Sequence, residues 1–331
     1  MAGATSRMQQ KTVIIDDLIT STFYDVRSKI VDNTFEITPF WEEMVNKSRI
    51  RARAPQGTHF EIPIRYGQTP GAIKYFGRGT EFGNVDEEHL TRLKFDIKNV
   101  GTSIVRYFTD EQANKGSAQI IDYANEKVET AEMSLADALS TDVLVQNGDA
   151  NSLTALETLL PTDNTSGSLG GLVRSGNSFL QHNVTDATGT TFSTGIIDLM
   201  KTMFNNCSLL KHGSRFPDII LTTQAIYESY EALAEAMQTI DTANPGAASL
   251  GFGQMSFKGK KLMWDPEVPA GTMYFLNLDS LEFAYDPDVW FEMTPWKTAQ
   301  NNLDRVAQIL TRGDMLLTVP RKNGIIHSIS V

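Results

Sequence analysis

Residues 117–146 read SAQIIDYANEKVETAEMSLADALSTDVLVQ and contain neither glycine nor proline. Large apolar residues recur every seven positions, at Ile121, Val128 and Leu135, and a row of small residues lies between them: Ala124, Ala131 and Ala138. This spacing predicts one long helix that buries both rows. The other faces, which we expect to be exposed, carry Asp122, Glu126, Lys127, Glu129, Glu132 and Asp137. At 1.5 Å per residue the helix would be about 45 Å long, so it is either a strut across the molecule or an ordinary amphipathic core helix.

Length and composition are those of a soluble globular protein. The chain has 331 residues, of which 41% are hydrophobic and 21% charged, so it is long enough for two domains. No run of about eighteen apolar residues predicts a membrane span. The start, MAGATSRMQQKTVIIDD, has no apolar segment before a cleavage site, so we expect no secretory signal. A single cysteine, Cys207, excludes an intrachain disulfide and fits assembly in a reducing cytoplasm.

The net charge of −11 argues against a protein that grips nucleic acid, because phosphate binding needs clustered basic residues. The nearest such cluster is Lys47, Arg49, Arg51 and Arg53. Glu42 and Glu43 partly offset it, and we interpret it as a solvated loop.

An arm and a long hairpin loop are predicted ahead of the long helix. Residues 1–35 show little pattern beyond a helical stretch at about 14–30, as in a leader that orders against a neighbour. HFEIPIR (59–65) and LKFDIKNV (93–100) alternate as strands, and 103–108 continues in the same way. The residues between the first two strands are rich in turn formers: Gly67, Pro70, Gly71, Gly77, Gly79 and Gly83. A loop of this length is usually functional.

Charge and aromatic residues in this loop indicate a contact surface. Its first flank is basic, with Arg65, Lys74 and Arg78, and its second is acidic, with Glu81, Asp86, Glu87 and Glu88. Tyr75, Phe76 and Phe82 near the tip need a surface to cover them. We therefore expect the loop to pack over a neighbouring subunit.

A second, differently organised half follows the long helix. Helices are predicted at about 152–160, from Ser193 or Thr194 to about 210, and at 224–237. Strands are predicted at 217–223, 261–264, 273–278, 281–285 and 289–293, and a glycine- and alanine-rich loop at 243–253. The chain closes with strands 305–311 and 315–319, predicted to form a hairpin across Arg312-Gly313-Asp314.

No catalytic, cofactor-binding or metal site is predicted. The histidines are scattered, at His59, His89, His182, His212 and His327, and Glu87-Glu88-His89 lacks the second histidine of a zinc helix. No serine has the flanking glycines of a nucleophile elbow. The stretch 253–260 is one residue too long for a phosphate loop, with Lys261 where a magnesium-binding hydroxyl belongs, and Gly251-Phe-Gly253 followed by Ser256 breaks the dinucleotide fingerprint.

Three segments of the second half are similar to one family. Residues 170–177, GGLVRSGN, resemble its "GGIDRS…N" segment, and 216–223, FPDIILTT, with Tyr227 and Tyr230, resemble its strand-then-helix unit. Residues 257–265 and 269–277, FKGKKLMWD and PAGTMYFLN, resemble "G-x-P-φ-φ-x-D … P-x-G-x-φ-Y-φ-φ-N", with Lys260 and Lys261 in place of a small residue and a proline. Their order over about residues 35–331 resembles that of the major capsid proteins of tailed double-stranded DNA phages.

This resemblance implies the α+β tailed-phage major capsid fold. Its parts would be an N-terminal arm and lead-in (1–60), an extended β-hairpin loop (61–100), a peripheral domain (101–165) with a spine helix at 117–146, an axial α/β domain (166–300) and C-terminal strands (301–331) that return to either domain. Some family members join a loop lysine to a neighbour's asparagine, and Lys74 is a conceivable donor.

The function that the resemblance implies is structural and not enzymatic. Copies of the chain would form hexamers and pentamers of an icosahedral shell that encloses double-stranded DNA without sequence-specific binding, assembled in the host cytoplasm and located in the virion. Partners would be the portal, a separate scaffolding protein and a decoration protein, with no membrane and no cofactor. The alternatives are an encapsulin-like bacterial nanocompartment shell and a cytosolic enzyme with an unrecognised site.

Overall fold

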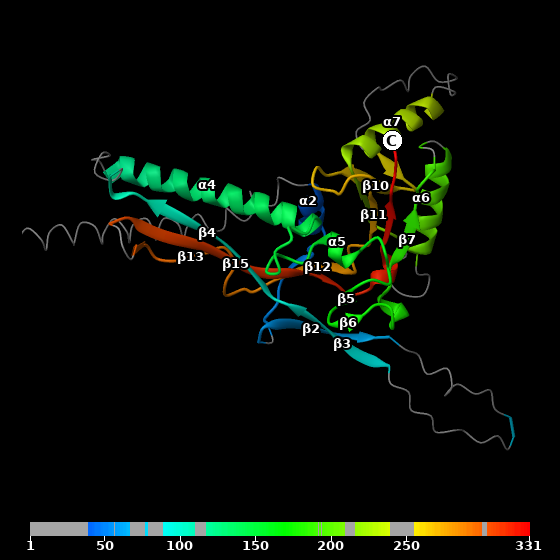
Figure 1. Ribbon diagram of the computed structural model, residues 1–331, viewed down its shortest axis with the longest axis horizontal. Helices are drawn as coiled ribbons and strands as arrows, with labels where there is room; N and C mark the ends of the chain where they lie inside the picture. The colour runs from blue at the N-terminus through cyan, green and yellow to red at the C-terminus, as the bar shows by residue number, and fades with distance from the viewer. Residues whose placement is uncertain are drawn as a thin grey trace, which may run out of the picture.

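The computed structural model describes residues 39–55, 57–66, 77–78, 89–109, 117–190, 192, 194–208, 216–238, 255–299 and 303–331. The predictions for the helix at 14–30, the loop aromatics, Lys74 and the acidic flank of the loop, the loop at 243–253 and His212 fall outside these residues, as do the side chains at positions 117–126. Of the predicted loop charges, Arg65 and Arg78 are described, and both are exposed. Within them the predicted α+β class is confirmed, with two six-stranded sheets (Figure 1).

One of these sheets, here called the long sheet, is built around a single strand, β15 (Arg305–Leu317). Its other strands are β1 (Ile50–Ala52), β12 (Leu281–Tyr285), β13 (Glu292–Met293), β14 (Lys297–Thr298) and β4 (Lys98–Arg106). β4 runs antiparallel to β15 from the pair Lys98 and Gly313 to the pair Arg106 and Arg305. The helix α4 (Ser117–Leu144) lies along β4 and β15 (Figure 1), so the predicted long helix is confirmed, and it packs on this sheet.

The buried stripe of α4 differs from the predicted one. Val128 and Leu135 are buried as expected, but Ala138 is exposed, and Leu139 and Val143 continue the stripe. An α-helix has 3.6 residues per turn, so a seven-residue row drifts by about 20° per repeat and leaves the sheet. The same drift turns Glu132, predicted to be exposed, into a half-buried position.

The other six-stranded sheet, here called the compact sheet, has the order β7 (Asn183–Asp186), β16 (Gly324–His327), β11 (Met273–Leu276), β8 (Ile219–Thr222), β10 (Lys260–Trp264) and β9 (Ser256–Phe257). Helices α6 (Thr194–Asn206) and α7 (Gln224–Gln238) pack against it. Alternate residues of β11 point to two cores: Met273 and Phe275 join the side chains of α6 and α7, whereas Tyr274 and Leu276 join the core shared with the long sheet. Both faces are therefore covered, and every residue of β8 and β11 is buried.

Smaller elements connect the two sheets and form the base of the extended loop. The helix α2 (Pro39–Asn46) buries Phe40, Trp41 and Met44 in the shared core, and α5 (Leu156–Leu159) follows the end of α4. The strands β2 (His59–Arg65) and β3 (Leu90–Asp96) pair antiparallel over their whole length. They form a two-stranded sheet of their own, so the base of the predicted hairpin loop is confirmed.

Two predictions about the second half were wrong. Arg312-Gly313-Asp314 is not a hairpin turn, because β15 continues through it. Glycine is needed at position 313 because the neighbouring strand lies close, and not because the chain turns there. A Cβ on Gly313 would lie 2.6 Å from the Ala284 carbonyl oxygen. The residue pattern predicted no strand at 183–186 and none after 319, yet β7 and β16 are neighbours in the compact sheet. Such short strands carry too few residues to show a period in the sequence.

Candidate functional site

The described histidines lie in separate places and have structural partners. His59 lies 3.2 Å from Glu61, and His327 lies 3.7 Å from Asp186. His182 is buried; its Nε2 donates to the Pro161 carbonyl at 2.7 Å, and burial lowers its pKa to about 4. Among the described residues, no group of three or more His, Cys, Asp or Glu side chains is placed to hold a metal ion.

The other groups singled out for chemistry also have structural roles. Lys258 and Gly259 form the tight turn between β9 and β10, with φ of 49° and 74°, and no helix follows to complete a phosphate loop. Burial raises the pKa of the Cys207 thiol to about 12, so it is protonated near neutral pH and is no nucleophile. Asp314 accepts hydrogen bonds from both the backbone N–H and the hydroxyl of Thr154.

The basic stretch predicted as a solvated loop is instead a paired strand. β1 runs parallel to β12, with Ile50 opposite Phe283. Each cation faces an acid of the same chain: Lys47 with Asp218 at 2.7 Å, Arg49 with Asp279, Arg51 with Glu282 at 4.0 Å, and Arg53 with Glu282 at 2.9 Å. These pairs hold the cations against the protein, so the stretch is poorly suited to binding phosphates.

The first family-like segment, 170–177, contacts the hairpin of β2 and β3 and connects it to the rest of the molecule. Gly170 and Gly171 have positive φ in the turn between β5 (Ser168–Leu169) and β6 (Leu172–Val173). The Gly170 carbonyl accepts from the Lys94 N–H at 3.0 Å, and a Cβ on Gly170 would lie 2.6 Å from that of Leu93. Only glycine can adopt this positive φ and also lie this close to the strand β3.

Arg174 of the same segment is buried inside this joint. Its guanidinium donates to the Leu159 carbonyl at 2.7 Å and to Nδ1 of His182 at 3.3 Å. It thereby ties the chain after α5 to the chain before β7. Desolvation lowers its pKa, as expected for a buried cation.

The two remaining family-like segments join the sheets through polar side chains. Asp218, before β8, accepts from the Leu278 N–H at 3.1 Å besides pairing with Lys47. Asn277, after β11, donates from Nδ2 to the Phe216 carbonyl at 3.0 Å, and its own N–H donates to the side chain of Asn323. These residues fix the turns at one end of the compact sheet.

The far end of the long sheet, by contrast, leaves apolar side chains exposed. We call this the open edge and define it by Tyr107, Phe108 and Leu303, which are 51%, 40% and 70% exposed. The Phe108 N–H donates to Asp304 at 3.0 Å, which brings the two segments together. Beside them the Arg106 guanidinium lies 4.1 Å from the centre of the Trp296 ring. Clustered exposed apolar groups at a strand end are typical of a contact surface.

Comparison with known proteins shows a shared fold without sequence similarity. No family model and no curated protein matches the sequence. The capsid asymmetric unit of cyanophage A-1(L) superposes with a TM-score of 0.60 at 12% identity, over 86% of this chain and 91% of that one. Mycobacterium phage Bobi gives 0.51 at 13% identity, over 85% and 89%. The chain has the phage capsid fold. The holo-SrpI encapsulin of Synechococcus elongatus PCC 7942 shares it, with a TM-score of 0.51, 9% identity and 89% coverage of both chains.

Within this phage capsid fold, the segments singled out by family likeness form internal contacts, and the open edge was not predicted. The family-like segments carry glycines, Arg174 and Asn277, whose chemistry is visible in the sequence and whose roles are internal. Tyr107 and Phe108 had been read as the end of a strand, and Leu303 was not singled out. The available signal was two adjacent aromatic residues at a strand end, where alternation would allow only one to be buried.

Proposed function

We propose that this chain is a structural major capsid protein that assembles as hexamers and pentamers into an icosahedral shell around double-stranded DNA. The observation that carries the proposal is the phage capsid fold over most of the chain, shared with the cyanophage capsid. The extended hairpin loop and the open edge support it, because a subunit of a closed shell needs surfaces that its own chain leaves uncovered. A net charge of −11 would limit adhesion of enclosed DNA to the wall.

In this proposal the parts keep the bounds derived above. Residues 1–60 are the arm and lead-in, 61–100 the extended loop, 101–165 the peripheral domain with the spine helix, 166–300 the axial domain and 301–331 the returning strands. β15 lies in the long sheet and β16 in the compact sheet, so the last segment would tie the two domains together. Portal, scaffolding and decoration proteins would be its partners in the virion. Among the described residues no helix is long and apolar enough to cross a bilayer.

The proposal is tested by assembly of the purified chain, alone and co-expressed with a scaffolding protein from the same genome. Size-exclusion chromatography followed by negative-stain microscopy should show closed particles of uniform diameter. A small oligomer that persists in both conditions would overturn it.

Removal of the loop tip tests the role of the extended loop. Deleting residues 68–84 should leave the monomer folded, since the pairing of strands β2 and β3 remains, but should abolish closed particles. Circular dichroism and microscopy measure the two outcomes. A variant with a glycine–serine linker of equal length in place of 68–84 separates loss of contact from loss of length. Intact particles from both variants would show that the loop has no role in closure.

A nanocompartment shell is the second candidate, because the SrpI encapsulin has the same fold. The two differ in content. Particles recovered from native cells should contain nuclease-protected DNA if the chain is a phage capsid protein, and a cargo protein with little DNA if it is a compartment shell.

A further inference from the structure

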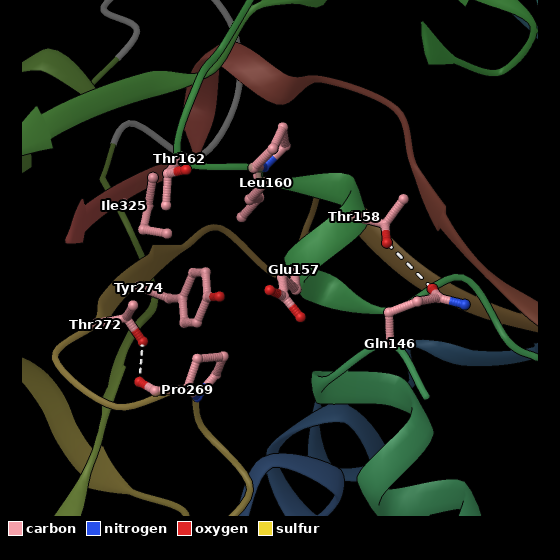
Figure 2. Close-up of a pocket in the computed structure, with 10 residues that line it drawn as sticks. Gln146, Glu157, Thr158, Leu160, Thr162, Pro269, Thr272, Tyr274 and Ile325 are labelled. Atoms are coloured by element: carbon pink, nitrogen blue, oxygen red, sulfur yellow. Dashed lines mark hydrogen bonds between the residues drawn. The ribbon is translucent and has the colours of Figure 1, made fainter. Parts of the chain in front are cut away.

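A cavity of about 440 Å³ lies where the end of α4 and α5 meet the compact sheet (Figure 2). Its walls are mixed, with the apolar residues Leu160, Pro161, Pro269 and Ile325 beside several polar ones. This volume is within the range of sites that hold small organic groups, and such sites are common where two parts of a fold meet.

A buried hydroxyl faces this cavity. Tyr274 on β11 is 1% exposed, and its hydroxyl makes no hydrogen bond of ordinary geometry, although the Thr272 side chain lies near enough to oppose the rise of its pKa. Figure 2 shows the hydroxyl pointing across the cavity toward Glu157 of α5. Burial, followed by the Glu157 carboxylate, raises the pKa of Tyr274, so the group is a neutral hydroxyl. A buried polar group left unpaired is costly, which indicates that a ligand completes it.

The sign of the missing ligand follows from the remaining polar groups. Glu157 is the one charged side chain among the residues that line the cavity. The Thr158 hydroxyl is already engaged with Gln146, and the Thr272 hydroxyl donates to the Pro269 carbonyl. With the hydroxyls of Tyr274 and Thr162, which can donate as well as accept, the cavity presents oxygen atoms and one negative charge beside apolar side chains. An anion would meet the carboxylate, whereas a cation on an apolar stem would satisfy both features.

We propose that this cavity binds a guanidinium or alkylammonium group carried on a short apolar stem. The cation lies between the Glu157 carboxylate and the Tyr274 hydroxyl oxygen and donates hydrogen bonds to both, and the stem contacts Leu160, Pro269 and Ile325. The group has two sources of the same chemistry, a free organic amine or an Arg or Lys side chain of another copy of the chain. The site does not depend on the proposed shell function.

Calorimetric titration of the unassembled full chain tests the site with two matched probes, butylguanidine and its uncharged analogue butylurea. Butylguanidine should bind saturably, and butylurea at least about tenfold more weakly, since it lacks the charge that Glu157 attracts. Glu157→Gln should weaken butylguanidine binding by about tenfold or more. Tyr274→Phe should weaken it about threefold to tenfold, through loss of one neutral hydrogen bond.

Glu129→Gln, which removes an exposed carboxylate on α4, is the matched control and should bind as the unmodified chain does. Because Glu157 is itself exposed, its substitution should leave the thermal unfolding temperature unchanged. Absence of butylguanidine binding, equal binding of butylurea, or an unchanged affinity in Glu157→Gln would each overturn the proposal.

Zero-length carbodiimide coupling distinguishes the two sources, using native particles assembled from a mixture of ¹⁵N-labelled and unlabelled chains. Peptide mass spectrometry that joins Glu157 to a lysine of a differently labelled chain identifies another copy as the source. An uncoupled Glu157, with an organic amine released on denaturation, identifies a free ligand. Particles that yield neither product contradict occupancy of the site by a primary amine and restrict the proposal to a guanidinium, which the titration tests directly.

Discussion

The compact and long sheets differ in how completely their side chains are buried. The compact sheet lies between two cores, and every residue of β8 and β11 is buried within one chain. The long sheet is covered by α4 on one side, and β4 alternates between exposed and partly buried positions until its last three residues. At its far end the open edge exposes aromatic and aliphatic side chains. The central strands of the compact sheet are thus buried within one chain, whereas the far end of the long sheet leaves a cluster of apolar side chains exposed.

The largest expected effect comes from making the same truncation in both halves. Phe275→Ala, in the compact sheet at 0% exposure, should lower the free energy of unfolding by about 3–5 kcal/mol because it leaves a cavity between β11 and the helices. Phe108→Ala, at the open edge, should change it by about 0.5 kcal/mol or less. Urea denaturation of the unassembled chain measures both. Similar losses for the two variants would contradict the difference between the halves.

A smaller effect is expected from acid titration in the long sheet. Burial raises the pKa of Asp314 from 3.8 to about 6. The folded chain therefore holds that proton more tightly than the unfolded chain, so this residue's contribution to stability is greatest below pH 3.8 and is lost as the pH rises through about 6. The free energy of unfolding of the unmodified chain relative to Asp314→Asn should fall by about 2–3 kcal/mol over that window.

Urea denaturation at several pH values measures this difference, with Asp198→Asn, an exposed carboxyl on α6, as the control. Glu132 should act in the same direction, because burial, followed by Glu129, raises its pKa to about 7. His182, near the compact sheet, should act in the opposite direction: its lowered pKa makes acidification from pH 6.5 to about 4 destabilising. A constant difference between the unmodified chain and Asp314→Asn across this range would refute the assignment.

The smallest effect on stability should accompany a large effect on assembly. Leu303→Asp places a charge on the open edge and should leave the free energy of unfolding within about 0.5 kcal/mol of the unmodified chain, because Leu303 is 70% exposed. If another copy covers this edge, the charge must be desolvated there, and closed particles should be lost. Met133→Asp, at a 58% exposed position on α4, is the matched control. Normal particles from Leu303→Asp would show that the edge stays in solvent.

The sequence by itself determined the local elements whose pattern is long enough to repeat. The helix at 117–146 was predicted and is observed as Ser117–Leu144, because nearly eight turns without glycine or proline leave no other regular structure. The strand Leu281–Tyr285 and the helix that begins at Gln224 were also predicted.

Only the tertiary structure decided how these elements face one another. It turned Ala138 outward and Glu132 partly inward, since the sheet beneath the helix selects the stripe that a straight 3.6-residue helix can keep in contact. It extended β15 through Gly313, where a close neighbouring carbonyl, absent from any local pattern, requires glycine. It paired Lys47 with Asp218 and aimed the Tyr274 hydroxyl at Glu157 across a cavity. Each of these contacts joins residues far apart in the chain, and local periodicity carries no information about such distances.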